Sequence, residues 1–268
     1  MNNSYKLYYI EKNKEKYNDS VMPKMWEILE EVFHKIAVGD DQIAYLGLYG
    51  SQNYRIDNKD SDIDCECFIF PWDVDILYGN PFFSTCITTK YGTCHVKDIR
   101  MAFKELLKSS PNILEVFATP YAIINKDYEF IINKICNEHI NSFANLSRPK
   151  LVKGLEGLLK RYSKSIDTSY KYFANVLRIS DMIQKVIDGK EYLDILVPQN
   201  YEELRFAKQR LGPVDDESLR WFSKLQSCRN LIINEFYEKN SFTPNGDIFD
   251  TIEYWESQLM IKYIRLRF

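Results

Sequence analysis

Two aspartates, Asp62 and Asp64, and the pair Gly50-Ser51 are the residues of this sequence whose types and spacing could do chemistry. Residues two apart on a strand point to the same face, so Asp62 and Asp64 could converge on one divalent cation. A tight turn at Gly50-Ser51 that opens a helix could offer backbone N–H groups and a hydroxyl to a phosphate. Together they predict a site for a metal-bound nucleoside triphosphate. The alternative is a polar turn at a solvated strand edge, which does not account for the Gly-Ser pair or its spacing.

The elements that position these residues can be predicted from hydrophobic periodicity. Apolar residues at helical spacing predict an amphipathic helix over 22–37. A strand over 43–49 leads into the Gly-Ser turn, and a strand over 62–70, with alternating acidic and apolar residues, carries the aspartates. Residues 73–90 are expected to be irregular, and another strand is expected over 91–97.

The second half of the chain changes character near Arg148, where strand patterns give way to helical periodicity. We therefore expect an α+β protein, with a mixed domain over 1–147 that carries the chemistry and a helical domain over 148–268 that binds substrate or nucleotide. Helices are expected over 151–162, 172–187, 201–210, 219–238 and 251–266.

Composition narrows the class of protein. A net charge of −3 argues against a general nucleic-acid coat. The six cysteines form no CxxC pair and the three histidines are far apart, so reduced, mostly buried thiols are expected rather than a zinc cluster. No apolar signal region begins the sequence and no window is long enough to span a membrane. We expect a cytoplasmic protein without a membrane partner.

Gly50-Ser51, followed ten residues later by Ser61-Asp62-Ile63-Asp64, resembles the signature of the DNA polymerase β-like nucleotidyltransferase superfamily. The segments 97–100 and 112–119 are similar to one branch of it, the predicted nucleotidyltransferases common in phages and bacteria. Further similarity lies in 171–178, 189–190 and 204–208, so the resemblance spans roughly residues 43–210.

The resemblance implies a polymerase-β-like mixed sheet with flanking helices, then an all-helical domain, with the nucleotide between them. It implies a template-independent nucleotidyltransferase that uses Mg²⁺ or Mn²⁺ and an NTP. Asp62 and Asp64 would hold the metals, and Gly50 and Ser51 the β- and γ-phosphates, with Lys59 or Arg55 as charge partners. The acceptor hydroxyl could belong to an RNA end, a nucleotide, a small molecule or a protein.

The superfamily expects a third carboxylate on a later strand, and here His95 stands in its place. Asp98 could complete the catalytic set if the strand ends there, or it could cap the following helix. Glu66, on the face of Asp62 and Asp64, is the second candidate, with an ion pair as its other role. Because histidine does not bind magnesium comparably, the alternative function is a nucleotide-binding module that has lost transfer activity and acts as a sensor or partner protein.

Lys171 and Arg178, seven residues apart, share one helix face and match the branch's helical pattern, so both are candidate triphosphate or substrate contacts. They belong to a basic run over 148–178 with interleaved tyrosines. That run could grip a polynucleotide, or it could be a solvated helix face.

Three further residues have expectations of their own. Glu115 is expected to be buried and to form an ion pair with a basic residue such as Arg100. Tyr54 could stack on a nucleobase or serve packing. Asp57, on the loop between the two motifs, is expected to be solvated.

Overall fold

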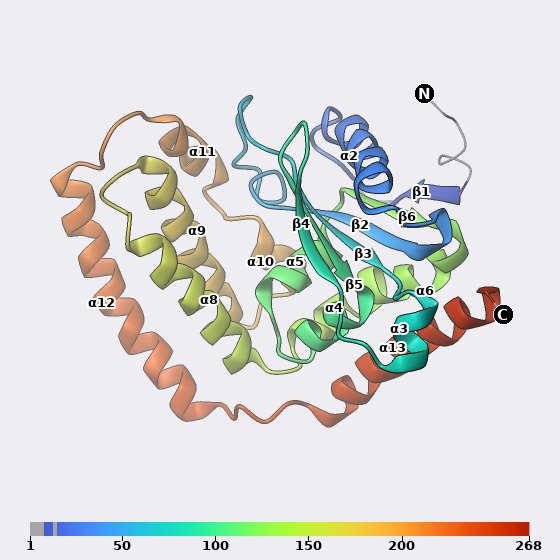
Figure 1. Ribbon diagram of the computed structural model, residues 1–268. Helices are drawn as coiled ribbons and strands as arrows, with labels where there is room; N and C mark the ends of the chain where they lie inside the picture. The colour runs from blue at the N-terminus through green and yellow to red at the C-terminus, as the bar shows by residue number, and fades with distance from the viewer. Residues whose placement is uncertain (1–7, 13–14, 268) are drawn as a thin grey trace.

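In the computed structural model, which describes residues 8–12 and 15–267, a six-stranded mixed sheet lies beside an array of helices (Figure 1). Residues 1–7, where no signal segment is expected, lie outside the described residues. The strand order is β1-β6-β2-β3-β5-β4. The strands are β1 Tyr9–Glu11, β2 Ile43–Tyr49, β3 Asp64–Ile69, β4 Ser84–Thr88, β5 Thr93–Asp98 and β6 Ala122–Asn125.

The centre of the sheet carries the chemically interesting residues. Strands β2 and β3 are antiparallel, with Tyr49 opposite Asp64. Strands β3 and β5 are parallel, with Glu66 opposite His95. Because side chains alternate along a strand, Asp64 and Glu66 share one face, while Cys65 and its neighbours at alternate positions are buried on the other.

Helices cover both faces of this sheet (Figure 1). Helix α2 (Val21–Ile36) packs its apolar stripe on one face, against Leu46 and Leu48 of β2 and Cys65 of β3. Helices α4 (Ile99–Leu106) and α5 (Pro111–Ala118) pack on the other face, where Phe68 is buried. The face that holds Asp64 and Glu66 is therefore only partly covered by apolar side chains.

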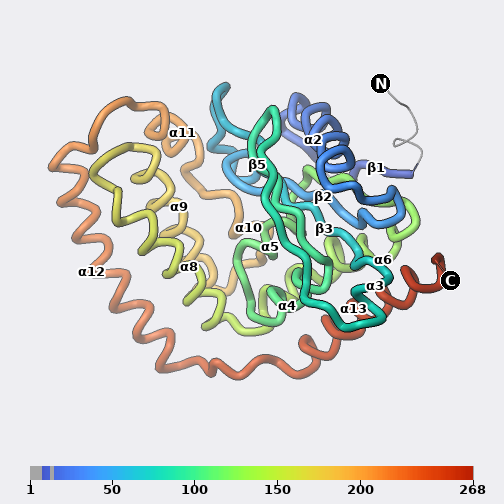
Figure 2. Tube along the Cα trace, viewed as in Figure 1, coloured from blue at the N-terminus to red at the C-terminus, as the bar shows by residue number. Residues whose placement is uncertain are grey.

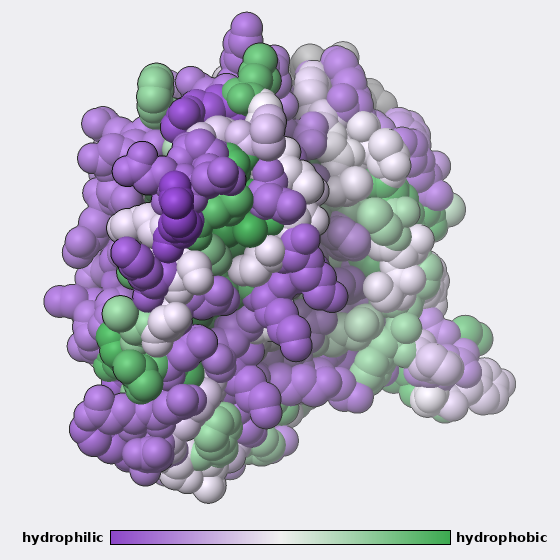
Figure 3. Space-filling view, turned by 90° about the vertical axis from the view of Figure 1, so that its left-hand side faces the viewer, coloured by the Kyte–Doolittle hydropathy of each residue, from purple (hydrophilic) through white to green (hydrophobic). Residues whose placement is uncertain are grey.

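Beyond α5 the chain is mainly helical. The helical elements, which include the π-helix over Lys134–Glu138, are α6 Glu129–Asn133, α7 Ile140–Ala144, α8 Arg148–Ser163, α9 Tyr170–Ile187, α10 Tyr192–Leu196, α11 Tyr201–Gln209, α12 Asp216–Lys239 and α13 Gly246–Arg267. Figure 2 traces α8, α9, α11 and α12 as a group to the left of the sheet. Figure 3 shows that this side is mostly hydrophilic, with apolar side chains in separate patches.

The last helix returns to the sheet side of the molecule rather than staying with the other late helices (Figure 1). The ring of Tyr263 stacks on Phe70 with centroids 4.2 Å apart, and its hydroxyl donates to the Pro71 carbonyl at 3.1 Å. Arg267 forms ion pairs with Asp41 and Asp73. Helix α8 begins at Arg148, but α6, the π-helix and α7 come before it, and by its contacts α13 belongs with the sheet.

Most elements expected from periodicity are present, but two expectations for the segment from 62 to 90 are wrong. Residues 73–90 are not irregular, because they form α3 (Asp73–Tyr78) and the edge strand β4. The strand expected over 62–70 is shorter, so Asp62 lies in the loop before β3. Four of the six cysteines are buried. In the part of the chain that the structure describes, no helix is both long and apolar enough to cross a membrane.

Candidate functional site

The turn after β2 is built around Gly50, whose φ of +102° is the left-handed conformation that glycine adopts without strain. The N–H of Asn53 donates to the Gly50 carbonyl at 3.0 Å, and that of Ile56 to the Ser51 carbonyl at 3.1 Å. The chain therefore forms consecutive turns after Ser51, in place of the expected helix. An added Cβ at Gly50 would meet no atom within 4 Å, so backbone conformation, not crowding, requires the glycine.

Glu115 of α5 fixes this turn through hydrogen bonds to three of its residues. Its carboxylate accepts a hydrogen bond from the Gly50 N–H at 2.6 Å, another from Asn53 Nδ2 at 3.2 Å, and one from the Tyr54 hydroxyl. The expected partner Arg100 binds Asp98 instead. Burial raises the pKa of Glu115, against the lowering effect of Arg178 and these hydrogen bonds. The Gly50 N–H is thus committed to the protein, whereas Ser51 lines the cavity next to this turn.

The acidic residues line the sheet side of one cavity. Asp62 is exposed, in the loop before β3, and Asp64 is half-buried as the first residue of that strand. Asp64 Oδ1 accepts from the Thr93 N–H at 3.0 Å and from the Thr93 hydroxyl at 2.5 Å. The predicted pair is therefore brought to one cavity, although only Asp64 lies on the strand.

The backbone between the two aspartates is held on both sides. The Ile63 N–H donates to the Tyr91 carbonyl at 2.8 Å. A Cβ at Gly92 would lie only 2.6 Å from the Ile63 carbonyl oxygen, so glycine permits this close approach. On the other side, Gln52 Nε2 donates to the Asp62 carbonyl at 2.9 Å. These contacts fix the spacing between the Gly-Ser turn and the acids.

Asp98 does not line the cavity. Its register partner is Ile69, five residues along β3 from Asp64, or about 16 Å at the usual rise. Its carboxylate caps α4 by accepting from the Arg100 N–H at 2.9 Å and pairs with the Arg100 guanidinium at 2.5 Å. Of its two expected roles, the structure shows the helix cap.

Glu66 and His95 occupy the inner part of the sheet side, opposite one another on β3 and β5. Glu66 is 4 % exposed and forms an ion pair with Lys97. Burial raises the pKa of Glu66, against the lowering effect of Lys97. The His95 ring lies 6.2 Å from that of Tyr49, and its Nε2 lies 3.9 Å from Cys86 Sγ. Glu66, the second candidate for the third acid, thus already forms an ion pair with a lysine.

Cationic side chains line the other side of the cavity. Lys171 and Arg178 come from α9 and Lys208 from α11, with Arg161 of α8 at the same cavity. Lys171 and Arg178 share a helix face as expected, but Lys171 is exposed whereas Arg178 is 4 % exposed. Asn175 lies between them, and its side-chain amide donates to the Lys171 carbonyl at 2.9 Å.

Arg178 is the most buried of these cations. Its guanidinium carbon lies 3.7 Å from the centroid of the Tyr54 ring, and Nη1 lies 3.1 Å from the Met182 sulfur. Its Nε is buried without a hydrogen-bond partner. Buried polar groups normally have partners, and this Nε is left unsatisfied even though Glu115 lies near enough for the guanidinium to lower its pKa. An anionic ligand in the cavity would meet this need.

The pKa of Lys208 is a second indication that the positive charge on this side of the cavity is not balanced. Its pKa is lowered to about 8, first because burial disfavours the charged form and then because Lys171 and Arg178 lie nearby. Asp57 and Asp62 oppose this lowering only in part. A phosphate group beside these three cations would raise the pKa of Lys208 again.

The cavity has a volume of about 560 Å³, which suits a ligand the size of a nucleotide. Its lining is polar and charged for the most part. It joins residues that are far apart in sequence: Tyr49, Gly50, Ser51, Tyr54, Asn58, Asp60, Ser61, Asp62, Asp64, Glu66, His95, Lys97, Asn112, Glu115, Leu158, Arg161, Tyr162, Lys171, Asn175, Arg178 and Lys208.

The residues present fit a magnesium ion only in part. Within residues 8–12 and 15–267, no three His, Cys, Asp or Glu side chains are placed to hold a metal. Magnesium in nucleotide sites is usually bound by one or two carboxylates together with substrate phosphates and water, so a preformed cage of three is not required. The exposed Asp62 and half-buried Asp64 are donors of the kind that magnesium prefers.

Two residues that line this cavity, and one in the loop beside it, are predicted incompletely or wrongly from the sequence. Lys208 was recognised only as part of a similar segment, and Glu115 was assigned the wrong partner. Asp57, expected to be solvated, is 8 % exposed.

No protein-family model matches the sequence, and a search of curated proteins finds no match.

Proposed function

We propose that this protein is a nucleotidyltransferase that moves a nucleoside monophosphate from an NTP to an acceptor hydroxyl. One observation carries the proposal: the two aspartates and a cluster of cations line the same cavity from opposite parts of the fold. An NTP with magnesium is a ligand that needs both, because its phosphates require positive charge and its metal requires carboxylates. The polymerase-β-like resemblance of the motif supports the same assignment.

The side chains have distinct roles in this proposal. Ser51 and the turn that carries it face the terminal phosphates, which Lys171, Arg178 and Lys208 hold from the helical side. Positive charge around the phosphates stabilises the charge that develops on the leaving pyrophosphate.

Asp62 and Asp64 would hold magnesium, which when bound supplies charge neutralisation and a lowered pKa for the attacking hydroxyl. The bond between the α-phosphorus and the bridging oxygen breaks as the acceptor oxygen attacks. The proton of the acceptor leaves to a base or to water. The Tyr162 ring at the cavity lining is available to pack against a nucleobase.

Release of pyrophosphate tests the proposal directly. The purified protein is incubated with each labelled NTP, magnesium or manganese, and in turn RNA, nucleotides, small-molecule hydroxyl compounds and protein as acceptors. We expect label in one acceptor together with pyrophosphate, and loss of both in Asp62→Asn and Asp64→Asn. Absence of any nucleotide-induced thermal shift in the wild type would contradict both transfer and nucleotide binding.

The alternative is a nucleotide-binding module without transfer activity. The ion pair between Glu66 and Lys97 favours it, because a neutralised third acid is poorly suited to accept a proton or hold a second metal. In that case the wild type binds NTP with magnesium but releases no pyrophosphate with any acceptor. Asp98→Ala serves as the matched control for both functions, since Asp98 caps α4 outside the cavity.

A further inference from the structure

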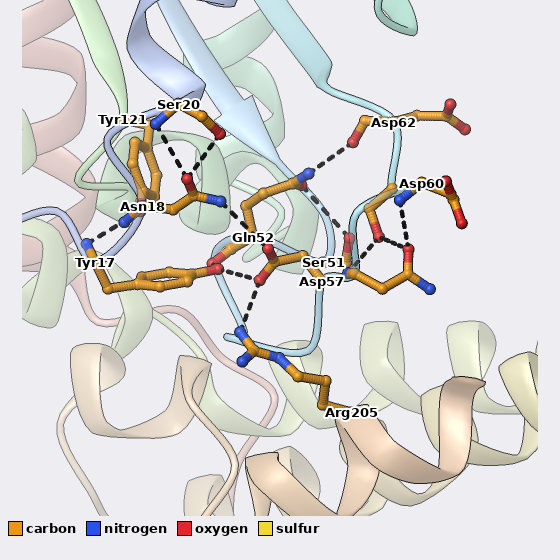
Figure 4. A network of polar contacts seen from close by, with 12 residues as sticks. Tyr17, Asn18, Ser20, Ser51, Gln52, Asp57, Asp60, Asp62, Tyr121 and Arg205 are labelled. Carbon is orange, nitrogen blue, oxygen red and sulfur yellow. Dashed lines mark hydrogen bonds and ion pairs between the residues drawn. The ribbon is translucent and has the colours of Figure 1, made fainter. Parts of the chain in front are cut away.

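The loop between the Gly-Ser turn and the aspartates is anchored on the side away from the cavity by Asp57. This carboxylate is 8 % exposed. Its Oδ1 lies 2.6 Å from the Tyr17 hydroxyl, and its Oδ2 accepts weakly from Asn18 Nδ2 at 3.4 Å. Arg205 of α11 forms an ion pair with the same carboxylate at 3.3 Å. Figure 4 shows Arg205 reaching from its helix to this point, so Asp57 joins three distant parts of the chain.

A second contact holds the same helix to the same loop. The guanidinium of Arg55, a residue with φ of +59°, lies 5.4 Å from the Tyr17 ring centroid and 5.9 Å from that of Tyr201. Tyr201 is the first residue of α11. Both contacts to α11 therefore start from residues of the loop that also contact Tyr17.

The spacing along α11 connects these contacts to the cavity. Tyr201, Arg205 and Lys208 stand at positions i, i+4 and i+7, so they form one stripe of the helix. The first two contact the loop, and the third lines the cavity. Fixing Arg205 on Asp57 thus fixes where Lys208 stands.

Contacts within the loop connect the Asp57 network to the acids. The Tyr17 hydroxyl contacts the Gln52 carbonyl, and the Gln52 side chain donates to the Asp62 carbonyl at 2.9 Å. In Figure 4 the Asp62 carboxylate points away from this network while its carbonyl faces Gln52. The network holds the backbone and leaves the carboxylate free to act.

We propose that Asp57 and Arg205 are positioning residues: their ion pair latches α11 onto the 50–62 loop, so that Lys208 stands across the cavity from Asp62 and completes the triphosphate site. The proposal rests on the proposed function, because it concerns binding of the same nucleotide. Neither residue of the pair needs to touch substrate. Because the pair acts through Lys208, its effect on nucleotide affinity should depend on whether Lys208 is present.

A double-mutant cycle on nucleotide affinity measures how far the effect of Arg205 depends on Lys208. MgATP and inorganic tripolyphosphate are titrated into the wild type, Arg205→Gln, Lys208→Gln and the double variant. We expect Arg205→Gln to weaken binding of both probes about fivefold, an effect typical of coupled neighbours. In the Lys208→Gln background the same change should have little further effect. Asp57→Asn should reproduce Arg205→Gln, and where turnover is measurable both should raise KM more than they lower kcat.

Arg220→Gln is the matched control, because it removes an exposed arginine from the neighbouring helix α12. If Arg205→Gln does not fold, Arg205→Lys keeps the charge without the planar fork, and we expect it to weaken binding to a smaller extent. Hydrogen exchange in the absence of nucleotide should be faster in α11 amides of the folded variants than in the wild type.

Two failures can be told apart. A wild type that binds neither probe with magnesium overturns the proposed function. A wild type that binds, with Lys208→Gln weakened and Arg205→Gln unchanged, overturns the latch alone. Equal effects of Arg205→Gln with and without Lys208 also overturn it, since the pair would then act by another route.

Discussion

The guanidinium of Arg178 lies over the ring of Tyr54, with its central carbon 3.7 Å from the ring centroid. The Tyr54 hydroxyl donates to Glu115, which in turn accepts from the Gly50 N–H. A chain of contacts therefore runs from the cation of α9, through an aromatic ring and a buried carboxylate, to the turn after β2. The two sides of the cavity are parts of one packed unit.

Replacing Arg178 by Met should destabilise the protein and weaken nucleotide binding together. Glu115 would remain buried without the cation that lowers its pKa, and leaving a buried charge uncompensated typically costs about 3 kcal/mol. Urea unfolding at neutral pH measures this loss. Adding Glu115→Gln should recover part of the stability and none of the MgATP affinity. A double variant as unstable as the sum of the single changes would show that the two charges do not interact.

Lys208→Gln should have opposite effects on stability and on binding. The pKa of Lys208 is lowered to about 8 in the folded protein, below its ordinary value. Folding therefore loses stability as the pH falls from the unfolded pKa toward about 8, and the cost is present at neutral pH. Removing the amine should stabilise the nucleotide-free protein by about 1 kcal/mol at neutral pH, allowing for solvent screening at this partly exposed group.

The same variant should bind tripolyphosphate less tightly, because one of three phosphate-facing cations is lost. Unfolding curves of wild type and variant at neutral pH and at about pH 10 test the stability argument, since the difference should shrink at high pH. Lys208→Gln less stable than the wild type at neutral pH would mean that the lysine is paired better than its surroundings indicate.

Much of the fold could be predicted from the sequence because local pattern decides it. The strand over 43–49 is bounded as expected, and Asp98 caps a helix where its position before an apolar periodic segment favours a cap. β4 was missed because its side chains alternate between exposed and half-buried at an edge, where apolar residues are not required.

The site was less predictable because its residues depend on distant partners. Nothing near Asp57 in sequence indicates burial, which follows from an ion pair to a residue 148 positions away. A helical pattern predicts that α11 is amphipathic, but it does not say which cavity Lys208 faces. Asp62 and Asp64, in contrast, are two residues apart, one just before β3 and one at its start, so their position at one cavity follows from spacing alone.

Asp98→Ala should separate stability from binding. The change removes the α4 cap and the ion pair to Arg100, and loss of a helix cap costs about 1 kcal/mol. Because Asp98 stands outside the cavity, MgATP affinity should match that of the wild type. Asp64→Asn should show the opposite behaviour, because it should weaken magnesium-dependent binding. A binding defect in Asp98→Ala equal to that of Asp64→Asn would return Asp98 to the metal site.

Glu115→Gln should change how stability depends on pH. Burial raises the pKa of Glu115 in the folded protein, so the folded state binds the proton more tightly than the unfolded chain does. That contribution to stability is complete at pH values below the ordinary carboxyl pKa and is lost as the pH rises through the folded value. The wild type should therefore lose stability relative to Glu115→Gln as the pH rises above the ordinary carboxyl pKa, as urea unfolding at each pH would show. Glu202→Gln, at an exposed position of α11, should leave the pH dependence as it is in the wild type. Parallel curves for wild type and Glu115→Gln would mean that Arg178 and the hydrogen bonds from the turn fully offset the burial of this carboxylate.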